Sequence, residues 1–191
     1  MSQLLTILAG GNHSKDIKAV AHGCGIYGIR IYDDDPATGF DPPPADLSGP
    51  IIIGINDPAL RAKMDDRFSH LQGFKPLVHP SVIVGERSQL GSGVVIAPGA
   101  VLLHSVTIGN HSHLNYMTSM TRCSIGDFCT IAPNATICGN VTIGDRCLIG
   151  ASATVCERSV IGHDVTIGAG ALIPPYSIVP NGVTVIGVWK Q

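Results

Sequence analysis

Three histidines lie close together near the middle of the chain, at positions 104, 111 and 113. Imidazole ionises near neutrality, so these side chains could serve as a general base that takes a proton from a reacting group. Two other readings remain open. Histidines are ordinary on the faces of a β-helix, and one histidine from each of three subunits could bind a metal at a symmetric interface. We expect no metal site.

A glycine pair and an acidic run form a second candidate site. Gly10-Gly11 separates an apolar run at 4–9 from an amphipathic stretch at about 14–23, and Asp33 and Asp34 follow the next apolar run. Glycines before a helix let the backbone approach a phosphate, and a carboxylate after the second strand suits a ribose hydroxyl or a base edge. An ordinary βα turn and a solvated acidic turn are the alternatives.

The elements around these residues predict a small parallel sheet. Strand, glycine turn, helix and strand follow one another, as in a dinucleotide-type βαβ unit. The segment at 37–50 is rich in Pro and Gly and is predicted to be a loop. A buried strand ending at Gly54 and a helix at about 58–70 come next. We therefore predict a Rossmann-like α/β domain over residues 1–74.

The rest of the chain repeats every six residues. Branched aliphatic residues recur from Val84 to Val179, commonly followed by a small residue, with a single step of five between Met120 and Ile125. A period of six indicates a parallel β-helix in which three hexads make one coil and residues 18 apart stack. We predict a β-helix domain over residues 75–191, with between five and six coils and flat, partly apolar sides that favour an oligomer.

Composition excludes several classes of protein. The net charge of −2 and the lack of a basic cluster argue against nucleic acid or an anionic membrane as a partner. Mean hydropathy is +0.30, but no apolar run is long enough to span a membrane. The first residues lack the features of a secretory signal, so a cytoplasmic protein is expected. Six cysteines show no CxxC pair or zinc spacing and are predicted to be reduced, partly buried thiols.

The order of these parts resembles a known family. Gly10-Gly11, Tyr32-Asp33-Asp34-Asp35-Pro36, Ile53-Gly54-Ile55-Asn56 and His79-Pro80-Ser81 precede the hexads, and Val185-Ile186-Gly187-Val188-Trp189-Lys190 follows them. The chain is similar over its whole length to hexapeptide-repeat sugar acetyltransferases, of the sialic acid O-acetyltransferase and bacillosamine-pathway N-acetyltransferase type.

The resemblance implies a left-handed β-helix, a homotrimer and acetyl-CoA in the groove between adjacent β-helices. It implies that the N-terminal domain binds a UDP- or dTDP-linked amino sugar of a surface glycan pathway. Family positions for the nucleotide sugar fall on the following residues: Gly10, Gly11, His13, Asp33, Asp34 and Gly54. Asn12-His13-Ser14 replaces the expected Gly-His-Gly. Those for acetyl-CoA fall on Thr130, Gly150, Ala151, Gly168 and Ala169.

The catalytic coil departs from the family. The usual histidine slots fall on Arg122, or Thr121, and on Thr130, none of which can act as a neutral base. One coil earlier, His104 and His113 repeat the family spacing of nine, with Ile108-Gly109 between them and Asn115 nearby. We therefore expect this displaced set to carry catalysis, with His79 and His163 as further candidates for the base.

The resulting prediction is an acetyl-CoA-dependent N-acetyltransferase acting on a nucleotide-linked amino sugar. Two alternatives remain. One is O-acetylation of a sugar of the sialic acid type. The other is an inert trimer that binds a nucleotide sugar or supports a partner enzyme, because the usual histidine is absent.

Overall fold

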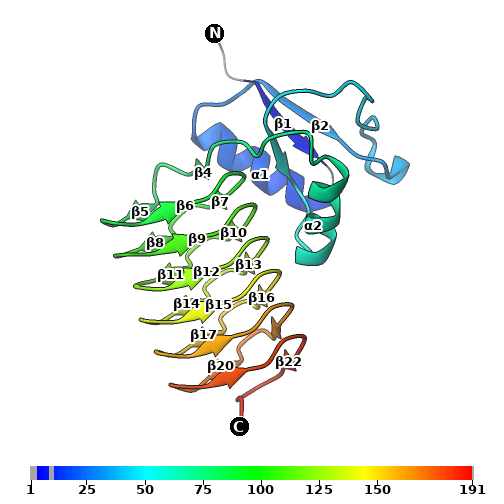
Figure 1. The fold of residues 1–191 in the computed structure, drawn as a ribbon. Helices are drawn as coiled ribbons and strands as arrows, with labels where there is room; N and C mark the ends of the chain where they lie inside the picture. Colours follow the sequence, from blue (N-terminus) through cyan, green and yellow to red (C-terminus); the bar gives the residue numbers. More distant parts are fainter. Residues whose placement is uncertain (1–3, 9–10, 191) are drawn as a thin grey trace.

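The computed structural model describes residues 4–8 and 11–190, and it joins a small α/β unit to a long parallel β-helix (Figure 1). Strands β1 (Leu5–Leu8), β2 (Ile29–Tyr32) and β3 (Ile51–Ile53) form a parallel sheet in the order β2-β1-β3. Helix α1 (Gly11–Gly23) connects β1 to β2, and α2 (Pro58–Arg67) follows β3. Strands β1 and β3 are fully buried, as their continuous apolar runs predict for a parallel sheet.

The helices begin at identifiable signals. Gly11 starts α1 with a φ of +54°, a left-handed conformation that glycine adopts without strain. Helix α1 therefore begins three residues earlier than its amphipathic pattern indicated. Helix α2 begins at a proline, and the side chain of its N-cap, Asp57, accepts a hydrogen bond from the Leu60 amide. The predicted loop contains only one short 3₁₀ helix, η1 (Pro36–Thr38).

The hexads form a three-sided solenoid of two-residue strands. Face 1 contains seven strands, and faces 2 and 3 contain six each, which gives six full coils. The strands of face 1 are β4 (Leu77–Val78), β7 (Val95–Ile96), β10 (His113–Leu114), β13 (Thr130–Ile131), β16 (Leu148–Ile149), β19 (Thr166–Ile167) and β22 (Thr184–Val185). Those of face 2 are β5 (Ile83–Val84), β8 (Val101–Leu102), β11 (Ser119–Met120), β14 (Thr136–Ile137), β17 (Thr154–Val155) and β20 (Leu172–Ile173). Those of face 3 are β6 (Gln89–Leu90), β9 (Thr107–Ile108), β12 (Ser124–Ile125), β15 (Thr142–Ile143), β18 (Val160–Ile161) and β21 (Ile178–Val179).

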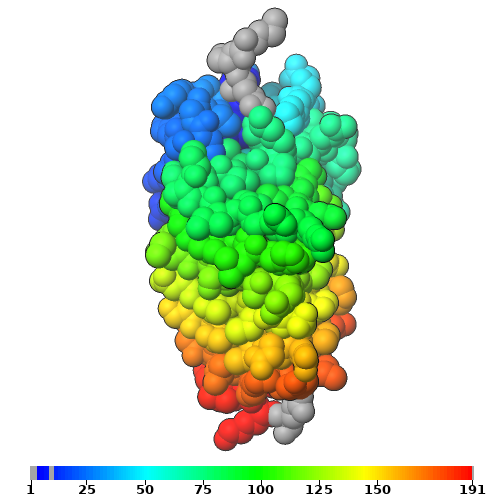
Figure 2. Space-filling model, turned by 90° about the vertical axis from the view of Figure 1, so that its left-hand side faces the viewer, coloured from blue at the N-terminus to red at the C-terminus, as the bar shows by residue number. Residues whose placement is uncertain are grey.

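Three corners separate these faces. Corner 1–2 follows the face 1 strands, corner 2–3 follows the face 2 strands, and corner 3–1 leads back to face 1. The coils appear as stacked bands in chain order (Figure 2). The second residue of each strand points inward, and those from Ile96 to Val185 are at most 3% exposed. The six-residue repeat is thus the spacing between one inward residue and the next.

The step of five shortens one corner by a residue. Between Leu102 and the left-handed residue Ser105 the chain has two residues, whereas between Met120 and Arg122 it has only Thr121. Strand partners on either side of this corner are 17 residues apart, as His113 and Thr130 are. In the next coil toward the C-terminus the partners are 18 residues apart, as Thr130 and Leu148 are. The inward positions stay in register because the corner absorbs the missing residue.

The two parts of the chain share a hydrophobic core. One buried cluster contains Ile7 of β1 and Ile17 of α1 together with Leu77 and Val95 of the β-helix. At the other end, Trp189 packs partly buried against the last coils, and its amide bonds the Leu172 carbonyl. Within the described part of the chain, no helix is long and apolar enough to cross a bilayer.

The cysteines are free thiols. Cys123, Cys129 and Cys147 lie inside the solenoid, while Cys24, Cys138 and Cys156 are half-buried. The step of nine places Cys129 and Cys147 before face 1 and Cys138 and Cys156 after face 2. The prediction of reduced, partly buried thiols agrees with this arrangement.

Candidate active site

The carboxyl edge of the small sheet lies against face 1 of the β-helix. Because β1, β2 and β3 are parallel, their C-terminal ends meet at one edge, and the Gly54 amide bonds the Leu8 carbonyl there at 2.7 Å. Beyond β3, the carbonyl of Asn56 accepts a hydrogen bond of 2.7 Å from the Thr130 hydroxyl on β13. The edge where ligands bind in open α/β sheets thus meets the middle coils of the β-helix.

Two histidines from the two parts meet at this contact. Nε2 of His13, in the first turn of α1, lies 2.9 Å from Nδ1 of His113 on β10. The side chain of His13 is 12% exposed, and His113 is 2% exposed as a residue. A hydrogen bond between two imidazoles needs one ring nitrogen to donate and the other to accept, so at least one ring is neutral.

Burial and a nearby cation keep both rings uncharged at neutral pH. Burial, followed by the charge of Arg61, lowers the pKa of His13 to about 4, although Asp16 opposes the shift. Burial also lowers the pKa of His113 well below its ordinary value, and Arg61, His13 and His111 act in the same direction. The site therefore presents unprotonated imidazoles, the form that can accept a proton.

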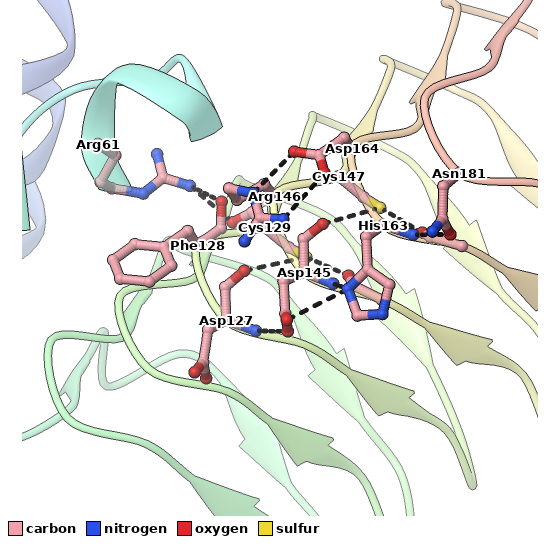
Figure 3. A network of polar contacts seen from close by, with 12 residues as sticks. Arg61, Asp127, Phe128, Cys129, Asp145, Arg146, Cys147, His163, Asp164 and Asn181 are labelled. Carbon is pink, nitrogen blue, oxygen red and sulfur yellow. Dashed lines mark hydrogen bonds and ion pairs between the residues drawn. The ribbon is translucent and has the colours of Figure 1, made fainter. Parts of the chain in front are cut away.

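Arg61 of α2 is the cation, and it is fully buried. Its guanidinium donates across the contact to the carbonyls of Phe128 and Cys129, at 2.8 and 2.9 Å (Figure 3). It also donates to the Thr130 hydroxyl. On its own side it donates to the carbonyls of Ile55 and Asn56. This one side chain joins the end of β3, α2 and the β-helix.

A polar cleft of about 470 Å³ opens beside α2 at corner 3–1. Nε2 of His111 lies 3.2 Å from an Asp65 carboxylate oxygen, and its ring stacks on Phe128 with an interplanar angle of 7°. Burial lowers the pKa of His111, although Asp65 opposes the shift. His111 lines this cleft, whereas His13 and His113 do not.

A second cavity, of about 310 Å³, lies between α1 and corner 1–2. Asn115 and Tyr116 line it from the β-helix, and Asp16 and Val20 line it from α1. Asn115 is half-buried and directly follows β10, the strand of His113. Two of the three predicted catalytic residues, His113 and Asn115, thus lie on one coil, and of these two only Asn115 lines the cavity.

The third, His104, lies elsewhere in the protomer. It is exposed at corner 2–3, where Nδ1 lies 2.8 Å from the Ser105 hydroxyl. Its carbonyl accepts a hydrogen bond from the Arg122 amide of the next coil, in agreement with the predicted stacking. An open hollow of about 540 Å³ at the shortened corner is lined by Arg122 and Ser105. Within one chain, the structure does not bring His104 to His113.

Four predicted acetyl-CoA residues share the corner of Asn115. Gly150 and Ala151 lie at corner 1–2 after β16, and Gly168 and Ala169 lie there one coil further on. The fifth, Thr130, is 1% exposed, and its hydroxyl is already bonded to Asn56 and Arg61. The corner residues form a line below the α1 cavity, whereas Thr130 serves the contact between the two parts.

The described substrate candidates follow the sheet strands at its carboxyl edge. Gly11 starts α1, Asp33 follows β2 and Gly54 follows β3. The carboxylate of Asp33 is buried and accepts a hydrogen bond from the Asp35 amide. Exposed Asp34 forms an ion pair with Arg67 at the end of α2. Gly10 lies outside the described residues.

The other two candidate bases have hydrogen-bond partners outside this contact. His79 bonds the Ser81 hydroxyl near the top of the β-helix. His163 belongs to a polar ladder along corner 3–1, in which a side chain of one coil accepts a hydrogen bond from a backbone amide of the coil above (Figure 3). The ladder runs through Asp127, Asp145, His163 and Asn181. Nδ1 of His163 is occupied by the Asp145 amide, which assigns this ring a structural role.

Several residues of the site were not singled out in the sequence. Arg61 and Asp65 lie on α2 and Asp16 lies on α1, and for charged residues of a helix a solvated position is the default expectation. Only the docking of α1 and α2 on the β-helix gives these three side chains their partners.

No cluster of three or more His, Cys, Asp or Glu side chains able to hold a metal occurs among residues 4–8 and 11–190. The chemistry available at the contact is proton transfer and hydrogen bonding by neutral imidazole, amide and carboxylate groups.

Comparisons with known proteins agree with this architecture. A family described as bacterial transferase hexapeptide (six repeats) matches residues 122–157. The GDP-perosamine N-acetyltransferase of Escherichia coli O157:H7 is 35% identical over 92 residues, which are 47% of this chain and 41% of that protein. The matched segment thus spans less than half of the curated relative.

Solved structures match over nearly the whole chain. PerB from Caulobacter crescentus, in complex with CoA and GDP-perosamine, has a TM-score of 0.86 at 27% identity, covering 98% of this chain and 95% of that one. The acetyltransferase domain of PglB from Neisseria gonorrhoeae, in complex with acetyl coenzyme A, has a TM-score of 0.72 at 26% identity and covers 96% of each chain. These matches confirm the resemblance based on the hexads and the α/β unit before them. Residues 122–157 therefore match the hexapeptide repeat of bacterial transferases, and the chain shares its fold with these acetyltransferase structures over nearly its whole length.

Proposed function

We propose that this protein transfers the acetyl group of acetyl-CoA to the amino group of a nucleotide-linked amino sugar. The observation that carries the proposal is the contact between the carboxyl edge of the small sheet and β10, where His13 and His113 pair at 2.9 Å. The proposal is supported by relatives that are named for this reaction or that hold CoA together with GDP-perosamine.

The nucleotide sugar would bind at the sheet edge. Gly11 offers a backbone amide at the N-terminus of α1, which favours a phosphate. Asp33 and Asp34 would contact the nucleoside, and Gly54 would allow its close approach. Because the relatives are named for GDP-perosamine, a GDP-linked amino sugar is the first candidate. The UDP- and dTDP-linked sugars expected from the sequence are the next.

Acetyl-CoA would lie along corner 1–2. Gly150, Ala151, Gly168 and Ala169 offer backbone groups with little side-chain bulk, which suits the pantetheine arm. This line leads up to Asn115 and the cavity beside α1, which brings the thioester towards His113. Thr130 would not contact acetyl-CoA; it would hold the α/β unit against the β-helix through its hydrogen bond to Asn56.

The transfer itself requires one base. The sugar amine attacks the carbonyl carbon of the thioester, the new C–N bond forms and the C–S bond breaks. The proton lost by the nitrogen passes to His113, and CoA leaves as a thiolate that takes up a proton from solvent. Asn115 would orient the acetyl group by hydrogen bonding. Neutral His113 is suited to this role because it needs no prior deprotonation.

A homotrimer would account for His104. Faces 2 and 3 and corner 2–3 expose apolar side chains that neighbouring β-helices could cover, namely Ile83, Val84, Leu103, Val160 and Ile178. In such an assembly, exposed His104 of one subunit would lie in the groove beside His113 of the next. We propose that this assembly works in the cytoplasm, where acetyl-CoA and nucleotide sugars occur, in a surface glycan pathway.

Release of CoA in the presence of acetyl-CoA and a panel of GDP-, UDP- and dTDP-linked amino sugars tests the proposal. Light scattering during gel filtration gives the oligomeric state in the same preparation. Turnover with an amino sugar, and none with the matching hydroxyl sugar, supports N-acetylation. Turnover with the hydroxyl sugar alone would assign O-acetylation instead.

One observation favours the alternative that the protein is an inert trimer. Arg122 occupies the corner at which the sugar acetyltransferases that the sequence resembles have a catalytic histidine. Thermal shift separates this case. Stabilisation by both CoA and GDP without turnover on any sugar would make the protein a binding or scaffolding trimer.

Mixing of variant subunits tests the role of His104. In trimers reassembled from equal amounts of His104→Ala and His113→Ala chains, about a quarter of shared sites would regain both histidines, because each site draws on two neighbouring chains. Recovered activity places the two residues in different subunits of one site. Full activity of His104→Ala alone would remove His104 from the mechanism.

A further inference from the structure

Arg61 has an unusual environment for a cation. It is 0% exposed, and its hydrogen-bond partners among the described residues are all oxygen atoms of neutral groups, from both sides of the contact. Among the described residues it forms no ion pair, and the side chain of the nearest acid in sequence, Asp57, is bonded to the Leu60 amide. Burial lowers the pKa of Arg61 to about 10, so it stays charged at neutral pH.

A buried charge without a counterion is costly, so a structural anchor alone does not explain it. A neutral side chain could join α2 to the β-helix at lower cost. Arg61 also leaves Nε without a partner, although this atom is buried. The charge of Arg61 therefore acts on the titratable groups around it.

Three imidazoles surround this charge. His113 is the neighbour of Thr130 across face 1, His13 is bonded to His113, and His111 lies at the adjoining corner. Arg61 lowers the pKa of each. Carboxylates oppose this shift at two of the three rings. Asp16 on α1 raises the pKa of His13, and Asp65 and Asp127 raise the pKa of His111. No acid is among the groups that shift His113.

The geometry also couples the charge to position. The two terminal nitrogens of Arg61 donate hydrogen bonds to different parts of the chain. Nη1 donates to the loop after β3, and Nη2 donates to the coil that carries Thr130. The same loop carbonyl, that of Asn56, accepts from Thr130. A planar guanidinium can hold these acceptors together, whereas a lysine ammonium has no such fork.

We propose that Arg61 is a positioning residue for the acetyl transfer, which locks the sheet edge onto β13 and holds the His13–His113 pair unprotonated and ready to accept the proton of the acceptor amine. This inference rests on the proposed function for the identity of the reaction. The proton taken by His113 would leave through His13 towards Asp16, whose carboxylate lies 3.8 Å from Nδ1 of His13 and is 73% exposed.

The test separates charge from geometry with two substitutions. Arg61→Lys keeps the charge and loses the fork, while Arg61→Met loses both. Titration of the His13 and His113 rings by nuclear magnetic resonance, in protein without ligands, should show both rings still neutral at pH values where a free imidazole is protonated, in wild type and in Arg61→Lys. In Arg61→Met, the rings should protonate at higher pH. Arg146→Met, which removes an exposed ion pair with Asp164, is the matched control.

Kinetics supply the second readout. Arg61→Lys should lower kcat about tenfold through lost positioning, with an unchanged pH profile, whereas Arg61→Met should also move the acidic limb of kcat/KM to higher pH. Unmoved ring titrations in folded Arg61→Met would overturn the charge role. Wild-type kcat in Arg61→Lys would overturn the positioning role.

If Arg61→Met does not fold, Thr130→Val and the wild-type titration still decide. Thr130→Val removes one acceptor and keeps the charge, so it should lower kcat and leave the ring titrations in place. Protonation of either ring near its ordinary pKa in wild type would refute the inference. The titrations need no substrate, so this outcome is independent of whether the proposed acetyl transfer is observed.

Discussion

His13 and His113 are 100 residues apart in the chain, and their ring nitrogens lie 2.9 Å from each other. One belongs to the first turn of α1 and the other to the third strand of face 1. The bond therefore exists only when the α/β unit is docked on the β-helix. It places a neutral imidazole pair at the edge of the sheet where nucleotides bind in open α/β folds.

Replacement of the proposed base should abolish most of the activity. His113→Asn keeps a polar side chain of similar reach but removes the basic nitrogen, and kcat should fall about a hundredfold or more. CoA release with the best amino sugar measures the effect. His22→Asn, on the exposed end of α1, is the control and should remain near wild type. An active His113→Asn enzyme would assign the base to another residue.

Acid should destabilise the folded protein between about pH 6.5 and pH 4. The pKa of His13 is about 4 in the folded state and near 6.5 when the chain is unfolded, so the unfolded state binds the proton first as pH falls. Stability contributed by the neutral ring is complete above pH 6.5 and is lost progressively down to about pH 4. The full effect is on the order of 3 kcal/mol.

Urea unfolding at a series of pH values measures this loss. His13→Gln lacks the titrating group and should show a shallower decline over the same window. A decline of equal slope in both proteins would attribute the acid sensitivity to other groups, such as His111 with Asp65.

The acidic turn should act on nucleotide-sugar binding. Asp34→Asn removes a charge at the sheet edge and should raise KM for the nucleotide sugar several-fold, with kcat within about twofold, since the reacting amine is not involved. Asp46→Asn, in the exposed loop before β3, is the matched control. Equal KM values for both variants would show that Asp34 does not contribute to nucleotide-sugar binding and serves only in its ion pair with Arg67.

The corner residues should act on the other substrate. Ala169 is exposed, so Ala169→Trp should fold normally while its ring fills the proposed pantetheine line. KM for acetyl-CoA should rise at least tenfold, because a bulky group replaces a close approach of backbone and ligand. Ala45→Trp, in the loop before β3, provides a matched control. An unchanged KM for acetyl-CoA in Ala169→Trp would move the donor to another corner.

Some of the site could be predicted because its signals are local. Gly11, Asp33 and Gly54 each follow a recognisable apolar strand, and parallel strands end at one edge, so their common location followed from the sequence. Likewise, the interval of 17 between His113 and Thr130 could be counted from the hexads, and the strand register confirms it.

Other parts of the site could not be predicted from local signals. The spacing of nine between His104 and His113 suggested a working pair, yet the solenoid turns through a corner between them and sends them to different sides of the protomer. His13 entered the prediction as a nucleotide contact, and its bond to His113 depends on the docking of α1. Asp16 and Asp65 looked like solvated helix residues for the same reason.

The sequence by itself determined the solenoid and the place of its one shortened corner, but it predicted between five and six coils where the structure has six full ones. Each coil is built from short-range repeats, in which a branched residue must point inward every six positions, so the pattern carries the fold coil by coil. Only the tertiary structure decided that Arg61 is buried and that two imidazoles meet. Those facts arise where two independently patterned surfaces pack together, and the energy of a buried polar contact depends on every partner that the packing supplies.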